Sequence, residues 1–237
     1  MFLSFAAIAQ NHWWSAAAGL ASALALKPTA IVPALLASVL WPALGLRLLP
    51  LMLIVLCAPF LFADREFVYR LYASLLERVS GATHEAGPKF KGLFNMLEFF
   101  GLVVPYSITT WVRVGAALGT LVLGWLAVRR LPKIGAAFNV FALSAIYLLL
   151  FNPRVEGLGY IALSLVVAPL AARALEMRAS TAVPLVAVCI LVAVPGLTPF
   201  TVRALGPWLL PSLTILTLFV VVVPRSLDSR SCPVPAV

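Results

Sequence analysis

The stretch LLPLMLIVLCAPFLF, residues 48–62, has fifteen residues and no charged side chain. Similar apolar runs lie at about 1–10, 13–26, 29–45, 100–128, 135–151, 157–172, 182–200 and 204–223. Of the 237 residues, 63% are hydrophobic and 11% charged, and the mean hydropathy is +1.07. A soluble domain has about 45–50% apolar and about 25% charged residues. The composition therefore predicts a membrane protein and excludes a soluble enzyme, a disordered chain and a disulfide scaffold.

The lengths of the runs predict the architecture. A helix that crosses a membrane uses about 20 apolar residues, so we expect an all-α polytopic bundle of about nine spans or half-spans. Prolines recur inside the runs, and each one kinks or breaks its helix. Broken helices occur where neighbours or a wet cavity satisfy the backbone, although proline is also frequent in ordinary membrane helices. We expect a single transmembrane domain over 1–237.

The formal net charge of +9 comes from 17 Lys and Arg against 8 Asp and Glu. The basic residues stand mostly singly at the ends of apolar runs, as the positive-inside rule and anionic headgroups require. A basic stripe with interleaved aromatic residues is missing, so we expect a lipid bilayer and no nucleic acid as partner. The three cysteines and two histidines have no metal-ligand spacing, so we expect no metal and no cofactor.

The basic turn at residues 129–133 is the densest in the chain and is expected on the cytoplasmic side. Counting spans from it places a turn at Arg47 and a tail over 224–237 in the cytoplasm. The same count places residues 63–99 outside and Lys27 near the outer side. We expect an inner (plasma) membrane protein of the bacterial type with a cytoplasmic C-terminus.

Residues 63–99 form the one long polar stretch. Phe67, Leu71 and Leu75 recur at helical spacing there, with charged residues mostly on the other face, which predicts an amphipathic helix in the membrane interface. The segment LFNMLEFF, residues 93–100, is expected to lie flat as well. Asp64 is a candidate general base, and it would need a cavity shared with a substrate.

Charged residues interrupt the apolar runs at three places, of which the first two are Lys27-Pro28 and residues 152–160. Lys27-Pro28 follows a small-residue helix, and its ammonium either meets a lipid phosphate or snorkels to the nearer interface. The segment NPRVEGLGY, residues 152–160, carries Arg154, Glu156 and Tyr160. Arg154 suits a phosphate and Glu156 suits sugar hydroxyls, whereas an ordinary solvated turn with an Arg–Glu pair explains the same residues.

Arg113 is the third place. It lies within the run 100–128, between WV and VGAALG. A charge at the bilayer centre costs at least about 2.5–3.5 kcal/mol on insertion scales. Arg113 therefore pairs with Glu98, faces a cavity that binds substrate, or marks the true start of its helix.

The segments AGLASALALKPTAIVP, residues 18–33, and FNPRVEGLGY, residues 151–160, resemble glycosyltransferase family 87. These are GT-C-type membrane enzymes related to polyprenyl-phosphate-mannose-dependent mannosyltransferases. In that family a small-residue helix ends in Lys-Pro, and an apolar run and a basic turn follow. A later helix runs into an N/S-P turn, and the next helix carries a tyrosine. The order and spacing match over most of this chain.

The resemblance implies an inverting transfer of a sugar, expected to be mannose, from a polyprenyl-phosphate donor to a glycan or glycolipid acceptor outside the cytoplasm. Lys27 and Arg154 would contact the donor phosphate. Glu156 and Tyr160 would line the same outer cavity, with Arg113 as a further cavity residue.

One departure from the family bears on catalysis. GT-C enzymes usually place an acidic base on the loop after the first span, whereas this chain begins inside what looks like a later span, and Asp64 does not match that position. The chain is then an N-terminally truncated homologue, a split enzyme that needs an N-terminal partner, or a non-catalytic remnant. A transporter or flippase of a lipid-linked or small polar substrate, and an accessory membrane subunit, are the alternative functions.

Overall fold

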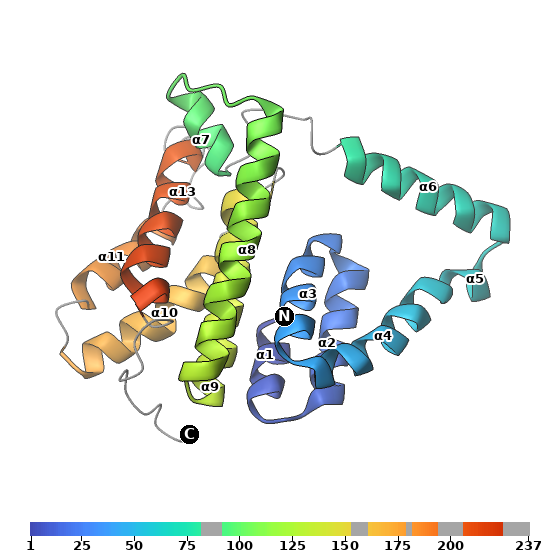
Figure 1. Ribbon diagram of the computed structural model, residues 1–237, viewed down its shortest axis with the longest axis horizontal. Coiled ribbons are helices and arrows are strands. Elements are labelled where there is room, and N and C mark those ends of the chain that lie inside the picture. Colours follow the sequence, from blue (N-terminus) through green and yellow to red (C-terminus); the bar gives the residue numbers. More distant parts are fainter. Residues whose placement is uncertain (82–91, 153–160, 179–181, 194–205, 225–237) are drawn as a thin grey trace. The chain divides into compact units, whose positions relative to one another are not determined.

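The computed structural model describes residues 1–81, 92–152, 161–178, 182–193 and 206–224. In these ranges the chain forms helices and turns and no strand, which confirms the predicted all-α class. The helices gather into two compact units, Met1–Glu85 and Ala86–Val237. Figure 1 shows the helices of each unit, which are described separately below.

Unit 1 contains six α-helices and one short 3₁₀ turn: α1 (Phe2–Ala9), α2 (Trp13–Leu26), η1 (Pro28–Ala30), α3 (Ile31–Leu40), α4 (Pro42–Cys57), α5 (Pro59–Phe62) and α6 (Arg65–Gly81). Helix α2 packs against α1 and α4, and α3 also packs against α4. Ile8, Leu20 and Leu44 are fully buried between them. Small residues on α2, such as Ala16 and Ala17, are buried as well, so the helices approach closely.

The break predicted at Lys27-Pro28 is confirmed. Helix α2 ends at Leu26, and Lys27 has an extended backbone with φ −146° and ψ 105°. Pro28 then begins the 3₁₀ turn that leads into α3. Because the residue before a proline is disfavoured in the helical region, the dipeptide itself accounts for the break.

The turn predicted at Arg47 is wrong. The chain instead breaks at Trp41, whose φ and ψ are −128° and 87°, and α4 starts at Pro42 and runs past Arg47. Proline suits the first position of a helix because its missing N–H would have no partner there and its φ is already helical. Trp41, as the residue before this proline, takes the extended conformation.

Unit 2 contains α7 (Leu93–Phe99), α8 (Tyr106–Arg130), α9 (Lys133–Phe151), α10 (Ile161–Glu176), α11 (Ala182–Ala193), α13 (Gly206–Thr217) and a π-helical turn (Leu218–Val222). Helix α9 is buried along most of its length, and α7, α8, α10 and α13 pack against it. Helices α8 and α9 lie side by side in Figure 1 and are joined by the short turn between Arg130 and Lys133.

The apolar run 100–128 is not one helix. Helix α7 ends at Phe99, Gly101 has a positive φ of 82°, and α8 begins at Tyr106 directly after Pro105. Glycine adopts that φ without the penalty of a Cβ atom, so it permits the sharp turn here. The helix predicted within 93–100 is present as α7, and it packs against α9 and α13.

Three helices are long and apolar enough to cross a membrane: Pro42–Phe62, with 21 residues, Tyr106–Arg130, with 25, and Lys133–Phe151, with 19. A helix of 21 residues is about 31 Å long, close to the thickness of the hydrocarbon core. Apolar helices of half-span length accompany them, namely Trp13–Leu26, Pro28–Leu40 and Ala182–Val192. The described residues therefore contain three full-length candidate spans among the nine spans or half-spans predicted.

Helix α6 confirms the amphipathic helix predicted after residue 63. Phe67, Leu71 and Leu76 are exposed, and Glu66 and Arg70 form a 2.9 Å salt bridge. The Tyr72 hydroxyl donates a 2.6 Å hydrogen bond to the carbonyl of Leu56 in the last turn of α4. The Phe60 ring also contacts the rings of Tyr69 and Tyr72, at centroid distances of 5.6 and 6.1 Å. These contacts attach α6 to the end of the span formed by α4 and α5.

Candidate functional site

The predicted site residues lie in different parts of the chain. Lys27 is exposed at the break between α2 and η1, and Asp64 is exposed just before α6, both in unit 1. Arg113 lies on α8 in unit 2. Arg154, Glu156 and Tyr160 lie outside the described residues, directly after the end of α9 at Phe151 and Asn152.

Arg113 lies inside a candidate span. Helix α8 begins at Tyr106, seven residues earlier, so the interpretation of Arg113 as the helix start is wrong. Its guanidinium carbon lies 5.3 Å from the centre of the Phe94 ring of α7. Its Nε atom is buried and has no hydrogen-bond partner among the described residues. Glu98, the partner considered for a salt bridge, is exposed and forms no ion pair with Arg113 in the described structure.

Aromatic side chains from α7 and α9 gather around Arg113. The Phe94 ring lies 6.4 Å from that of Phe151, which lies 5.3 Å from that of Tyr147. The Tyr147 hydroxyl donates a long hydrogen bond, 3.4 Å, to the backbone carbonyl of Arg113. We call these four residues, Phe94, Arg113, Tyr147 and Phe151, the Arg113 cluster. Three helices contribute to it, so the cluster depends on the packing of α7 on α8 and α9.

Helix α7 is held in place by close contacts at its start and at its middle. Gly92, just before α7, is buried, and a Cβ atom there would lie 3.2 Å from the carbonyl oxygen of Leu150. It would also lie 3.3 Å from the carbonyl oxygen of Asn152, so only glycine fits without displacement. Further along, Ser212 of α13 contacts the Met96 sulfur at 3.6 Å. Helix α7 therefore lies against the C-terminal end of α9, where the segment with Arg154 begins.

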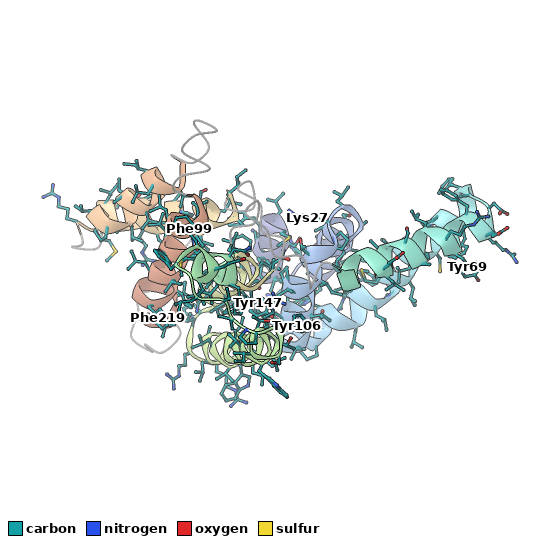
Figure 2. The ribbon with its side chains drawn as sticks, turned by 90° about the horizontal axis from the view of Figure 1, so that it is seen from above. Lys27, Tyr69, Phe99, Tyr106, Tyr147 and Phe219 are labelled. Atoms are coloured by element: carbon teal, nitrogen blue, oxygen red, sulfur yellow. The ribbon has the colours of Figure 1, made fainter. Side chains whose placement is uncertain are left out.

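Figure 2 views the molecule from the side on which α7 lies in Figure 1. Tyr106 at the start of α8 and Tyr147 near the end of α9 are both labelled in that view, close to each other in unit 2. Phe99 marks the end of α7 in the same unit. The Arg113 cluster thus lies towards the end of unit 2 that is opposite the basic turn between α8 and α9.

The depth of Arg113 in a membrane can be derived from its distance to the C-terminal end of α8. There the guanidinium carbon of Arg129 lies 4.2 Å from the centre of the Trp125 ring. Tryptophan and arginine at a helix end mark the membrane interface. Arg113 is twelve residues from Trp125, which is about 18 Å along the helix. Arg113 therefore lies within the hydrocarbon core when Trp125 lies at its edge.

The cation–π contact does not offset the cost of this position. A guanidinium over an aromatic ring gains about 0.5–2 kcal/mol, against at least about 2.5–3.5 kcal/mol for arginine at a bilayer centre. An arginine has five N–H donors in a planar fork that matches phosphate and carboxylate oxygens. An anion bound to Arg113 would use these donors, whereas the ring of Phe94 cannot accept them all. The arrangement is suited chemically to binding a phosphate or a carboxylate.

Sequence reasoning missed two features of the structure. Phe94 lies in the short segment 93–100 and Tyr147 in the apolar run 135–151, each among similar residues, and only the packing of α7 and α9 on α8 distinguishes them. Arg47, predicted in a turn, lies inside α4, where its Nη1 donates a 2.6 Å hydrogen bond to the carbonyl of Ala43. Its guanidinium carbon lies 5.8 Å from the centre of the Trp14 ring. The proline at residue 42 is the signal that indicates a helix start before Arg47.

Metal chemistry has no candidate ligands in the described part of the chain, where no group of three or more His, Cys, Asp and Glu side chains comes together. Comparisons with protein-family models, with curated proteins and with solved structures found no match. The resemblance to glycosyltransferase family 87 therefore stays a prediction from the two sequence segments that carry it.

Proposed function

We propose that this chain is an integral membrane protein that binds the phosphate of a polyprenyl-phosphate sugar, with Arg113 as the phosphate-binding cation. The observation that carries the proposal is the guanidinium of Arg113, which lies inside a candidate span over the Phe94 ring with its buried Nε unpartnered in the described structure. A charge at this depth calls for a counter-charge. In this proposal the phosphate of the bound lipid supplies that counter-charge.

The aromatic side chains of the cluster suit the rest of such a ligand. Phe94 and Phe151 offer apolar ring surface beside the guanidinium. A polyprenyl chain gains about 25 cal/mol for each Å² of apolar surface that leaves water, so it is suited to an apolar surface within the membrane. The cluster therefore combines one cation for the phosphate with apolar contacts for the carrier.

The reaction we propose is the transfer of the sugar, as the resemblance to glycosyltransferase family 87 implies. The acceptor is a glycan or glycolipid outside the cytoplasm, and the donor sugar is mannose. Arg154 follows α9 directly, and Glu156 and Tyr160 come from the same segment of the chain. In this proposal Arg154 contacts the donor phosphate, and Glu156 and Tyr160 contact the sugar. Asp64 is the candidate base, and an N-terminal partner is the other source of that group.

A transporter or flippase is the second candidate function, and the prolines and the π-helical turn within helices of unit 2 favour it. Pro169 and Pro211 lie inside α10 and α13, and a π-helical turn follows at Leu218–Val222. π-helical turns are uncommon overall, but those that occur often lie at functional sites. Hydrophobic segments that contain helix-breaking prolines are typical of transporters. A non-catalytic accessory subunit is the third candidate, and it requires no ligand at Arg113.

The experiment compares transfer with movement of the same substrate. The full chain is reconstituted in liposomes with a radiolabelled polyprenyl-phosphate mannose and a glycolipid acceptor. We expect labelled acceptor, and we expect the yield to fall at least tenfold in Arg113→Ala but not in the control Arg129→Ala. Movement of the labelled lipid between leaflets without transfer would favour the transporter. Neither transfer nor movement nor binding, in a folded sample, would contradict both.

A further inference from the structure

A second arginine, Arg47, lies over an aromatic ring at one end of unit 1. Helix α2 begins at Trp13, Trp41 separates α3 from α4, and α4 begins at Pro42. The 5.8 Å contact between the Arg47 guanidinium and the Trp14 ring shows that α2 and α4 begin at the same end of unit 1. Three tryptophans and one arginine at one end of a bundle are typical of a membrane interface.

Arg47 bends back towards that end. Its Nη1 donates to the carbonyl of Ala43, one turn nearer to the start of α4. Arg47 is five residues beyond Pro42, about 7–8 Å along the helix, so this bend brings the guanidinium close to the helix start. Long basic side chains in membrane helices reach the interface in this way. The remaining donors include Nε, which is buried and unpartnered in the described structure.

The described residues of unit 1 hold no acidic side chain near Arg47. Residues 1–63 contain no aspartate or glutamate, and the first acidic residue, Asp64, follows the far end of the span Pro42–Phe62. That end lies about 31 Å from the start of α4. The counter-charge for Arg47 therefore comes from outside unit 1.

The surface around Arg47 is apolar and open. Leu46 is 77% exposed, Leu49 64% and Trp14 60%, although all three lie on membrane-length or half-span helices. Exposed leucines beside a cation suit acyl chains, and an indole with a guanidinium suits a headgroup. A free inorganic phosphate would use the guanidinium and leave these leucines and the indole uncovered.

We infer that Arg47 and Trp14 form a binding site for an anionic glycerophospholipid. The guanidinium binds the phosphodiester oxygens through the donors that the Ala43 carbonyl leaves unused. Trp14 covers one face of the guanidinium, and the acyl chains pack on Leu46 and Leu49. This site lies in unit 1 and is independent of sugar-donor binding at Arg113, so either one can fail without the other.

The test measures the lipid that the full chain retains. The protein is extracted from bilayers with equal amounts of phosphatidylglycerol and phosphatidylcholine, and bound lipid is counted by native mass spectrometry. We expect phosphatidylglycerol to be retained in preference to phosphatidylcholine. Arg47→Gln should lower its retention about fivefold, since a basic residue near an anionic surface contributes about 1 kcal/mol. The control Arg65→Gln removes an exposed arginine at the opposite end of the span and should retain lipid as the wild type does.

Two further arms keep the inference falsifiable. Arg47→Lys keeps the charge and loses the planar fork, so its retention of phosphatidylglycerol should lie between that of the wild type and that of Arg47→Gln. It replaces Arg47→Gln as the test variant if Arg47→Gln does not fold. Inorganic phosphate at millimolar concentration should not displace the lipid. Equal retention of the two lipids, equal retention by Arg47→Gln and the wild type, or displacement by phosphate would overturn the inference.

Discussion

Arg47 in unit 1 and Arg113 in unit 2 are both membrane-helix arginines over an aromatic ring, yet their surroundings differ. Arg47 lies near the start of α4, and it donates a hydrogen bond to the carbonyl one turn back. Arg113 lies seven residues inside α8, about 18 Å from Trp125, and α7 covers it with Phe94. The first position is that of an interface residue. The second lies inside a candidate span, and with Trp125 at the membrane interface it falls within the hydrocarbon core, where a charge needs a counter-charge.

The difference shows that the interpretation of a charged residue in an apolar run depends on where its helix begins. Arg47 changes from a turn residue to an interface residue because α4 begins at Pro42. Arg113 changes from a helix-start candidate to an interior residue because α8 begins at Tyr106. The same residue type therefore supports a lipid contact in one unit and a substrate contact in the other.

The largest expected effect separates the two arginines directly. Arg113→Ala should weaken binding of a polyprenyl-phosphate sugar at least about thirtyfold, because truncating one partner of a buried charge pair costs about 2–5 kcal/mol. Arg47→Ala should change the same affinity less than about twofold, since Arg47 is not a member of the Arg113 cluster. Equilibrium binding of the radiolabelled donor to the full chain in nanodiscs measures both. Equal losses in the two variants would contradict the distinction between them.

The aromatic partners should differ in the same way. Phe94→Leu keeps an apolar side chain but loses the ring face under Arg113, so donor affinity should fall about two- to thirtyfold, from about 0.5–2 kcal/mol of cation–π attraction. Trp14→Leu should leave donor affinity unchanged. Phe99→Leu is the matched control on α7, because Phe99 is exposed and contacts the Phe100 ring. A loss in Phe99→Leu as large as in Phe94→Leu would show that α7 packing, and not the ring over Arg113, sets the affinity.

The cover over Arg113 depends on Gly92. In Gly92→Ala the new methyl group would meet the carbonyl oxygens of Leu150 and Asn152 at 3.2 and 3.3 Å, so α7 must shift by a few tenths of an ångström. We expect a melting temperature lower by about 2–4 °C, which corresponds to about 1 kcal/mol in a chain of this size. Gly115→Ala is the control, because open space surrounds that position on α8 and alanine favours a helix. Thermal unfolding in detergent measures both, and a stable Gly92→Ala would refute the close approach.

In unit 1, a hydrogen bond from Tyr72 attaches α6 to the C-terminal end of α4, which is the end opposite to Arg47. Tyr72→Phe removes the hydroxyl that donates to the Leu56 carbonyl and keeps the ring contact with Phe60. The expected loss is about 0.5–1.5 kcal/mol, seen as faster amide hydrogen exchange in α6. Tyr69→Phe keeps its ring beside Phe60 and should exchange like the wild type. Unchanged exchange in Tyr72→Phe would show that the hydrogen bond does not hold α6.

Local chemistry made part of the fold predictable. The break at Lys27-Pro28 and the amphipathic helix α6 depend on a proline and on helical spacing, both of which are visible in the sequence. The break at Trp41-Pro42 lies inside an uninterrupted apolar run, so hydropathy did not indicate it. The turn was predicted at Arg47 instead, because that residue is charged. The extended stretch before Tyr106 also lies inside an apolar run, so hydropathy did not indicate it either.

The candidate site was predictable only in its charged member. Arg113 stood out because a charge in an apolar run is costly. Phe94 and Tyr147 did not stand out, because they meet Arg113 only through the packing of α7 and α9 on α8. The roles predicted for Arg154, Glu156 and Tyr160 concern a segment outside the described residues, and they stay predictions.

The measurement that tests the central proposal most directly is photo-crosslinking of the full chain with a polyprenyl-phosphate probe. The probe carries a diazirine on the prenyl unit next to the phosphate, and the adducts are mapped by mass spectrometry. If Arg113 binds the phosphate, the adducts should fall on α7 and on the C-terminal part of α9, and excess unlabelled donor should abolish them. Adducts confined to α2 and α3 beside Lys27, or adducts that excess donor does not reduce, would contradict the account.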